Sequence, residues 1–449
     1  MISTNTSALK TGLQIQGKTP LHGVVETFGA KNSVTKCLVA SLITDQPCRL
    51  YNVPDIQEVE ITVELLRSIG SLIEWNKEDH YITIETRAIT TRHIPVRFSG
   101  ANRIPILLMG ALLGRVHDTI VIPSVGGCQI GKRPVDLHLK ALTTLGAKIE
   151  LERDEDTLFY IACAPEGLKA AHIHLDYPSV GASENALLCA SWAKGVSYIS
   201  NICLEPEFLD LIHFLQKIGV IIEFIDDRTI KVQRGDRFGA VHHIVTDRSY
   251  AASFAMLAYA TKGEIFVKNA RQDHLVNFLS ILRKIGAPFY IEEGGIRFSY
   301  EKPLHGSIFV ETGPYPNFLT DMQQPLVTLL TQCNGVSFVH ETVYEQRFGY
   351  TKMLNEMGAN IELGTDCCGE LDCRFLNKQF QHSAKIIGAT PLFAKEIEIP
   401  DLRAGFSYVM AALIAEGTSR LYNIHYLQRG YGDLVAPLKN LGADIKNIF

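Results

Sequence analysis

The stretch Gly126-Gly-Cys-Gln-Ile-Gly-Lys-Arg-Pro134 places one cysteine, Cys128, among three glycines. Three glycines in six residues predict a loop, about residues 124–134, that does not pack tightly. Lys132 and Arg133 follow the cysteine, and nearby cations favour the thiolate form. A thiol in this setting suits proton transfer or nucleophilic chemistry. An ordinary glycine-rich turn with an incidental cysteine is the alternative that these residues alone leave open.

Basic residues elsewhere could hold an anion. Lys31 and Asn32, in Gly29-Ala-Lys-Asn32, precede a predicted helix, where free backbone N–H groups and the helix dipole favour phosphate or carboxylate. Several arginines stand near predicted helix starts or turns: Arg103, Arg133, Arg347, Arg403 and Arg429. The planar guanidinium suits the paired oxygens of phosphate and carboxylate. Each arginine alone is equally consistent with a solvated surface position, and a site requires several of them to converge.

Carboxylates and the remaining cysteines indicate less. Asp321 begins a predicted helix and could simply cap it. Cys367, Cys368 and Cys373 lie close together, but no histidine shares a recognised ligand spacing with them. We therefore expect no metal site. No phosphate-binding lysine loop, dinucleotide fingerprint or helical metal pair is evident either.

A repeated pattern predicts the elements that must position these residues. Leu, two residues, an aliphatic residue and Gly recur six times, ending at Gly70, Gly146, Gly219, Gly286, Gly358 and Gly442. Each site reads as a helix closed by glycine and followed by a strand. A second helix–Gly–strand pattern occurs within units, at 183–200, 251–267 and 404–422. Units of about seventy residues must pack together to bury their faces, so we expect an α/β protein with two three-unit lobes, dividing near 240–247, and a cleft between them.

Composition limits the class of protein. The chain has 449 residues, is 46% hydrophobic and 20% charged, and carries a net charge of −5, which does not favour a nucleic-acid partner. The polar start, Met1 to Gly12, lacks the apolar core of a secretory signal. The longest apolar run, 104–114, is too short for a membrane span. Cysteines such as Cys37, Cys163 and Cys189 have apolar neighbours, as in a reduced protein. We expect a cytoplasmic protein with no membrane partner.

Taken together, the motifs resemble the UDP-N-acetylglucosamine 1-carboxyvinyltransferase family. The resemblance covers nearly the whole chain. It rests on Gly29-Ala-Lys-Asn32, Gly126–Gly131 with Arg133-Pro-Val-Asp-Leu137, Ser179-Val-Gly181, Thr320-Asp-Met-Gln323, Glu341-Thr-Val343 with Arg347-Phe348, Asp401-Leu-Arg-Ala404 and Arg429-Gly-Tyr431. It implies two inside-out α/β barrel-like domains of three units each, 31–245 and 1–30 plus 246–449, with the active site in the cleft between them.

The resemblance also implies roles. The reaction would transfer the enolpyruvyl group of phosphoenolpyruvate to the 3-hydroxyl of UDP-N-acetylglucosamine and open peptidoglycan synthesis, with no cofactor, in a monomer or weak homo-oligomer. Cys128 would be the general acid, Asp321 would help to deprotonate the hydroxyl, and Lys31 would act in catalysis. Phosphoenolpyruvate would be bound by Lys31, Asn32, Arg133, Arg403 and Arg429. The nucleotide sugar would contact Arg103, Arg133, Pro134, Val135, Asp136, Leu137, Tyr177, Pro178, Ser179, Val180, Asp321 and Val343.

Some positions depart from the family pattern. Asp247-Arg-Ser-Tyr250 lacks a usual glutamate, Leu204 replaces an arginine, Leu319 replaces a proline, and the catalytic loop is one residue longer. These changes leave three alternatives open. One is the sister family that makes 5-enolpyruvylshikimate 3-phosphate, which lacks the cysteine loop. The others are a paralogue that modifies another nucleotide or nucleoside, and a catalytically silent sugar-nucleotide-binding protein.

Overall fold

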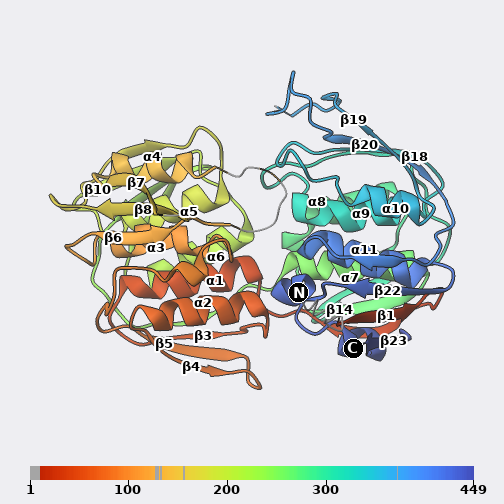
Figure 1. Ribbon diagram of the computed structural model, residues 1–449, viewed down its shortest axis with the longest axis horizontal. Helices are drawn as coiled ribbons and strands as arrows, with labels where there is room; N and C mark the ends of the chain where they lie inside the picture. The colour runs from red at the N-terminus through yellow and green to blue at the C-terminus, as the bar shows by residue number, and fades with distance from the viewer. Residues whose placement is uncertain (1–10, 127–130, 132–133, 155–156, 372, 449) are drawn as a thin grey trace, which may run out of the picture.

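The computed structural model describes residues 11–126, 131, 134–154, 157–371 and 373–448. Two hydrophobic cores organise these residues. One core runs from Val34 to Ile244, and the other combines Leu13 to Val25 with Ala251 to Ile445. Figure 1 shows the two corresponding lobes side by side, the first in orange to yellow-green and the second in green to blue. The first lobe is the part of the chain around the Val34–Ile244 core, and the second lobe is the part around the other core.

Three sheets belong to each lobe among the described residues. In the first lobe the strand orders are β13 (Val241–His243)-β3 (Cys48–Tyr51)-β5 (Tyr81–Glu85)-β4 (Leu72–Asn76), β6 (Ile120–Pro123)-β8 (Thr157–Cys163)-β7 (Lys148–Asp154) and β11 (Ile221–Asp226)-β12 (Thr229–Gln233)-β10 (Val196–Ser200)-β9 (His172–His174). In the second lobe they are β21 (Glu396–Glu398)-β22 (Thr418–Tyr422)-β1 (Gly12–Gln16)-β23 (Ile445–Ile448), β15 (Phe289–Glu292)-β16 (Gly295–Ser299)-β14 (Glu264–Lys268)-β2 (His22–Glu26) and β17 (Phe309–Glu311)-β18 (Gly335–His340)-β20 (Ser383–Gly388)-β19 (Asn360–Gly364). The six predicted units are therefore six sheets.

Helices fill the middle of each lobe, which is the reverse of a β-barrel. The inner helices are α1 (Lys31–Ala40), α3 (Leu107–Leu112) and α5 (Val180–Ala190) in the first lobe, and α7 (Arg248–Ala260), α9 (Gln323–Leu330) and α11 (Leu402–Ile414) in the second. Most of their residues are buried all round, as expected of helices surrounded by protein. The outer helices keep an exposed face: α2 (Gln57–Ser68), α4 (Asp136–Thr144), α6 (Pro206–Lys217), α8 (Val276–Lys284), α10 (Thr351–Glu356) and α13 (Val435–Asn440). The inside-out α/β architecture is as predicted.

The six repeated glycines close the outer helices as predicted. Each has a positive φ, between 74° at Gly286 and 117° at Gly358. In every case the residue after the glycine donates its N–H to the carbonyl five residues earlier, for example Ser71 to Leu66 at 3.1 Å and Ala443 to Leu438 at 2.9 Å. This bond defines the Schellman motif, in which glycine avoids the steric cost of the left-handed region.

The chain passes between the lobes at two neighbouring places. Strands β1 and β2 pair with β22, β23 and β14 of the second lobe, and the chain then enters α1 of the first. It returns after β13, which pairs with β3. An isolated bridge joins Gly29 to Thr246 at this crossing. None of the helices in the described ranges has the length and apolarity to cross a membrane.

Candidate active site between the lobes

Asp321 lies at the centre of a buried ionic cluster in the second lobe. Its carboxylate accepts hydrogen bonds from Arg347 Nη2 at 2.7 Å and Arg403 Nη2 at 3.0 Å. Asp321 belongs to a 3₁₀ turn, Thr320–Met322, and helix α9 has no side-chain cap, so the interpretation of Asp321 as a helix cap is wrong. Burial alone would favour the neutral acid, but Arg403, Arg347 and Lys31 hold the pKa of Asp321 well below its ordinary value.

Lys31 brings the first lobe to this cluster. It is the first residue of α1, and its backbone N–H donates to Asp247 Oδ2 at 3.3 Å. Burial, followed by the charges of Arg403 and Lys36, lowers the pKa of Lys31, although Glu58 and Asp321 oppose this shift. Asn32 follows on the same helix and is partly buried. Burial therefore disfavours the charged form of Lys31, and an anion bound beside it would favour that form.

Arg403 and Arg429 lie on helices that contact each other. Arg403 donates from Nη1 to the hydroxyl of Tyr431 at 3.2 Å, and its buried Nε has no hydrogen-bond partner among the described residues. Arg429, on α12 (His425–Tyr431), donates from Nη2 across to first-lobe residues, to Glu58 Oε2 and to the Ala101 carbonyl, both at 3.0 Å. Arg347 also has a buried, unpartnered Nε. Guanidinium groups with unused donors are suited to an oxyanion ligand.

The residues expected to hold the nucleotide sugar form several short segments. Residues 177–180 lead into α5, where Ser179 caps the helix and Val180 begins it. Pro134 and Val135 precede α4, which begins at Asp136 and continues with Leu137. Arg103 caps the 3₁₀ turn Ile104–Ile106.

Arg374 connects two of these segments across the cleft. Its guanidinium donates to the Val343 carbonyl at 2.5 Å and lies 4.6 Å from the centre of the Tyr177 ring. Burial raises the pKa of Tyr177 to about 12, so its phenol stays neutral.

Cys128 and Arg133 lie outside the described residues, but the residues flanking them are placed. Gly126 donates its N–H to the Asn102 carbonyl at 3.2 Å, in the first lobe. Gly131 lies against Glu345 of the second lobe so closely that an added Cβ would collide with its carboxylate. Gly126 therefore contacts the first lobe, and Gly131 contacts the second.

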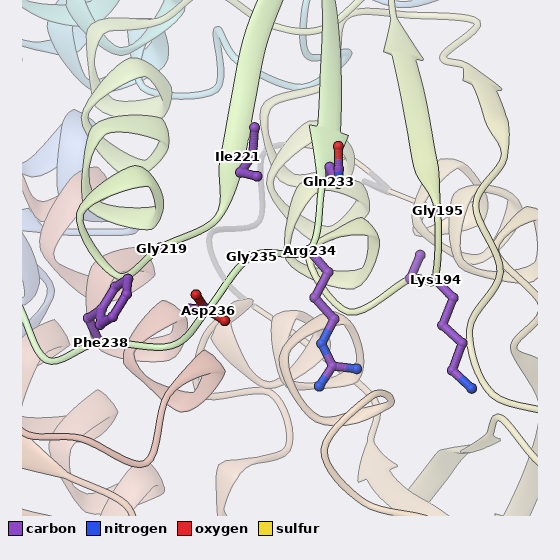
Figure 2. A pocket seen from close by; sticks show the side chains of 10 residues that line it. Lys194, Gly195, Gly219, Ile221, Gln233, Arg234, Gly235, Asp236 and Phe238 are labelled. Atoms are coloured by element: carbon purple, nitrogen blue, oxygen red, sulfur yellow. The ribbon is translucent and has the colours of Figure 1, made fainter.

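A separate hollow of about 650 Å³ lies on the first lobe, away from this cleft. Figure 2 shows Lys194 and Arg234 beside it, together with Asp236 and the turn glycines Gly195 and Gly219. It shares no residue with the ionic cluster or with the predicted substrate contacts.

Comparison with known proteins identifies the family. The profile of the EPSP synthase (3-phosphoshikimate 1-carboxyvinyltransferase) family matches residues 15–445. The UDP-N-acetylglucosamine 1-carboxyvinyltransferase of Protochlamydia amoebophila (strain UWE25) is 50% identical over 434 residues, which cover 96% of this chain and 93% of that protein. The protein of the same name from Chlamydia pneumoniae is 49% identical, with coverages of 96% and 94%. The chain belongs to the UDP-N-acetylglucosamine 1-carboxyvinyltransferase family. The resemblance predicted from the motifs is confirmed.

Solved structures establish the enolpyruvyl transferase fold for this family member. The enolpyruvyl transferase NikO from Streptomyces tendae has a TM-score of 0.85 at 22% identity, covering 98% of this chain and 99% of that one. EPSP synthase from Acinetobacter baumannii has a TM-score of 0.73 at 17% identity, with coverages of 98% and 100%.

The sequence motifs did not mark several residues that contact the predicted site residues. Glu58 looks like any charged residue on an outer helix, yet it is buried against Arg429. Arg374 stands in the long 365–382 connection and has no motif to mark it. Tyr431 was visible only as the end of Arg429-Gly-Tyr431, and the structure shows it bonded to Arg403 and Ser253.

Proposed function

We propose that this protein transfers the enolpyruvyl group of phosphoenolpyruvate to the 3-hydroxyl of UDP-N-acetylglucosamine and releases phosphate. The observation that carries the proposal is the buried Asp321–Arg347–Arg403 cluster beside Lys31, in a chain about 50% identical to named UDP-N-acetylglucosamine 1-carboxyvinyltransferases. The cleft runs between domains that we propose to comprise residues 31–245 and 1–30 plus 246–449. The reaction would be the first committed step of peptidoglycan synthesis, in the cytoplasm, and would serve cell-wall growth and division.

Cations line the proposed phosphoenolpyruvate site. Lys31, Asn32, Arg133, Arg403 and Arg429 would hold its phosphate and carboxylate. Lys31 adds the N-terminus of α1, whose first N–H groups favour a negative charge. Arg403 and Arg429 are bonded to carboxylates of the protein, which an anionic substrate would have to displace or join.

The nucleotide sugar would lie along both lobes. The residues proposed to contact it are Arg103, Arg133, Pro134, Val135, Asp136, Leu137, Tyr177, Pro178, Ser179, Val180, Asp321 and Val343. The contact of Arg374 with Tyr177 and Val343 supports this placement, because it draws one first-lobe and one second-lobe member of the set together.

The chemistry proceeds in two steps. In the addition, the sugar O3 bonds to C2 of phosphoenolpyruvate, Asp321 accepts the hydroxyl proton, and the Cys128 thiol donates a proton to C3. In the elimination, C3 loses a proton, the C2–O bond to phosphate breaks, and the enol double bond returns. A positioned acid and a positioned base each contribute about 10²–10⁴-fold. The cations stabilise phosphate through the tetrahedral intermediate.

Asp321 is a poor base while both arginines hold it. Its low pKa follows from the proximity of Arg403 and Arg347 after the cost of burial is included. Phosphoenolpyruvate would compete for Arg403 and so raise the pKa of Asp321 in the substrate complex. The carboxylate would thus become a stronger base when the reacting molecule is bound.

Substitutions at Cys128 test the proton donor. Cys128→Ala should lower kcat by at least ~10²-fold. Cys128→Asp should retain more activity, because a carboxylic acid can also donate a proton, and it should resist alkylation by the epoxide fosfomycin. Fosfomycin should inactivate the unmodified protein and add its mass to the Cys128 peptide. Full activity of Cys128→Ala, or full activity after prolonged fosfomycin excess, would contradict the assignment.

A further inference from the structure

A group of four potential metal ligands lies at one end of the β17-β18-β20-β19 sheet, within the second lobe. The imidazoles of His340 and His382 and the thiols of Cys367 and Cys373 each offer one atom, and these four atoms all lie within 4.8 Å of one another. Cys367 Sγ and His382 Nε2 are 3.3 Å apart. A tetrahedral zinc site with Zn–S of about 2.3 Å and Zn–N of about 2.0 Å has ligand separations of roughly 3.3–3.8 Å. The ligands therefore already lie close to such a geometry.

The sheet itself brings the ligands together. His340 is the last residue of β18, His382 directly precedes β20, and Cys367 follows the end of β19 by three residues. These strands are neighbours, with His340 paired to Ser383 and Gly364 paired to the same residue. Strand ends that meet at one edge thus place residues distant in sequence side by side.

Both histidines present an unprotonated nitrogen to the group. His382 Nδ1 lies 2.7 Å from the Phe380 carbonyl, which can only accept, so Nδ1 carries the proton and the unprotonated Nε2 faces Cys367 Sγ. His340 Nδ1 lies 2.8 Å from Glu311 Oε1, and its Nε2 is buried without a hydrogen-bond partner among the described residues. A carboxylate or carbonyl that orients the outer nitrogen is the usual support of a metal-bound histidine.

Glu311 also fixes the cysteine segment. Its second carboxylate oxygen accepts the backbone N–H groups of Glu370 at 3.0 Å and Leu371 at 3.1 Å. Gly369 allows this approach, because an added Cβ there would collide with the same carboxylate. One side chain therefore orients His340 and anchors the turn between Cys367 and Cys373.

A second group of possible ligands differs from this one in the hydrogen bonding of its histidine. Cys37, Asp210 and His242 also lie within 4.8 Å of one another. There, however, His242 Nε2 meets Asp210 at 3.0 Å and His242 Nδ1 meets Lys217 Nζ at 3.3 Å, so both ring nitrogens are occupied. The histidine of that group has both ring nitrogens in hydrogen bonds, whereas His340 Nε2 has no partner in the described part of the chain.

We propose that Cys367, Cys373, His340 and His382 bind a zinc ion as a closed, structural Cys₂His₂ site. Four protein ligands leave no open position, which is typical of structural rather than catalytic zinc. The zinc charge would also deprotonate both thiols, including that of Cys367, whose pKa is raised to about 12 by burial and by the nearby Cys373. The expectation of no metal site, which rested on sequence spacing, is replaced by this proposal.

The site would act on the cleft through Arg374. This residue follows Cys373 directly and contacts Tyr177 and Val343. The 365–382 connection is longer than the ~12–15 residues beyond which unstructured loops are uncommon, and zinc would fix it at both Cys367 and Cys373. This step rests on the proposed function, because Tyr177 and Val343 are proposed contacts of the nucleotide sugar.

Metal analysis of the full-length protein tests the site without reference to activity. Protein purified without chelators and supplied with zinc should hold about one zinc per chain, with X-ray absorption giving two sulfur ligands near 2.3 Å and two nitrogen ligands near 2.0 Å. Cys367→Ser and Cys373→Ser should each lose most of the zinc. Cys368→Ser is the matched control, because Cys368 is exposed, adjacent and outside the group, and it should keep the zinc. Less than ~0.1 zinc per chain, unchanged zinc in Cys373→Ser, or a Cys367–Cys373 disulfide in place of the metal would overturn the proposal.

A steady-state comparison tests the link to Arg374. Because a Cys373→Ser variant could lose structure more widely, the unmodified protein is compared before and after chelation and after zinc is restored. Zinc removal should raise KM for UDP-N-acetylglucosamine several-fold and leave KM for phosphoenolpyruvate within about twofold, and added zinc should reverse the change. Bound zinc with no change in either KM would reject the role of Arg374 and keep the metal site.

Discussion

The charge state of Asp321 determines what the cleft can do. Two buried guanidinium groups, Arg347 and Arg403, hold its partly buried carboxylate within hydrogen-bond distance. Such a cluster is stable only while charges of both signs are present, since removing one partner leaves the others buried without compensation. The same arrangement makes Asp321 the residue whose proton affinity a bound anion can most directly change.

Asp321→Asn should therefore affect stability and catalysis together. We expect a loss of roughly 3 kcal/mol in the free energy of unfolding, because two buried arginines lose their counter-ion. We expect kcat to fall by at least ~10²-fold, because the amide cannot accept the hydroxyl proton. The depressed pKa also means that the carboxylate stabilises the fold above its ordinary pKa near 4 and loses this contribution as the pH falls below it. Chemical denaturation across pH and steady-state kinetics measure both effects.

Glu207→Gln provides the matched control, because Glu207 forms a buried pair with Arg248 outside the Asp321 cluster. It should lose comparable stability with a much smaller loss of kcat. Equal losses of kcat in the two variants would show that Asp321 acts only through stability.

Single residues were predictable where a motif marks them. The motifs mark Lys31, Arg403, Arg429 and Asp321, and the structure places Lys31 and Arg403 beside Asp321. The hydrogen-bond partners of these residues, such as Glu58 for Arg429, were not visible in the sequence. His340 and His382 could not be linked to the cysteines by spacing, because neighbouring strand ends rather than a local turn bring them together. Contacts set by sheet register carry no short-range sequence signal.

At the scale of helices and strands, the repeat was the strongest signal. The backbone at six equivalent helix ends has φ > 0, which favours glycine. Because this preference is local, the glycine pattern is visible in the sequence. Three of the central helices, α5, α7 and α11, were predicted from the helix–Gly–strand pattern. The strand order was not predicted, because strand pairing depends on packing between distant segments. Of the cysteines with apolar neighbours in the sequence, Cys37 and Cys189 are buried, whereas Cys163 is partly exposed.

Alanine substitutions at two glycines of the repeat distinguish the cost of backbone strain from the cost of a steric clash. At Gly442 an added Cβ meets nothing within 4 Å, so Gly442→Ala should cost about 1 kcal/mol from the positive φ of 97° alone. At Gly219, where φ is 99°, the Cβ would also collide with the Asp236 carbonyl, so Gly219→Ala should cost at least ~2 kcal/mol. Urea denaturation of both variants measures the difference. Equal costs would mean that the turn at Gly219 relaxes without penalty.

Buried Glu184 of α5, which faces Lys36 of α1 at 3.7 Å, predicts a pH dependence of stability. Burial raises the pKa of Glu184 to about 7; Lys36 opposes the shift, and Glu205 and Glu207 add to it. The folded state thus binds this proton more tightly than the unfolded state, so the contribution is complete below pH 4.5 and is lost as pH rises to about 7. Glu184→Gln cannot ionise and should lose roughly 3 kcal/mol less than the unmodified protein over this interval. Equal slopes of unfolding free energy against pH in Glu184→Gln and the unmodified protein would contradict the raised pKa of Glu184.

At the scale of the whole molecule, polar contacts join the lobes around the cleft. Arg429 contacts Glu58, Arg248 contacts Glu207, and Arg228 donates to the Tyr315 carbonyl at 2.7 Å. Each lobe has its own hydrophobic core built from three units, so the number of repeats was enough to predict two lobes. The contacts between them could not, because they join residues that are far apart in the chain and belong to different units.

Substitution of Arg429 tests whether this residue binds substrate or only connects the two lobes. If it binds phosphoenolpyruvate, Arg429→Met should raise KM for that substrate at least tenfold, since a charge-assisted pair contributes about 1.5–3 kcal/mol. Glu58→Gln removes the carboxylate that competes for Arg429, so KM should stay the same or fall. Steady-state kinetics with phosphoenolpyruvate varied at saturating UDP-N-acetylglucosamine measure both. An equal rise of KM in Arg429→Met and Glu58→Gln would mean that Arg429 acts through its ion pair with Glu58 and does not bind phosphoenolpyruvate.

The central claim is that this cleft joins phosphoenolpyruvate to UDP-N-acetylglucosamine. The most direct measurement incubates the purified protein with phosphoenolpyruvate and either UDP-N-acetylglucosamine or shikimate 3-phosphate, and follows phosphate release and product mass together. We predict one phosphate released for each enolpyruvyl-UDP-N-acetylglucosamine formed, and neither product with shikimate 3-phosphate. Phosphate release that requires shikimate 3-phosphate, or no release with UDP-N-acetylglucosamine, would contradict the account.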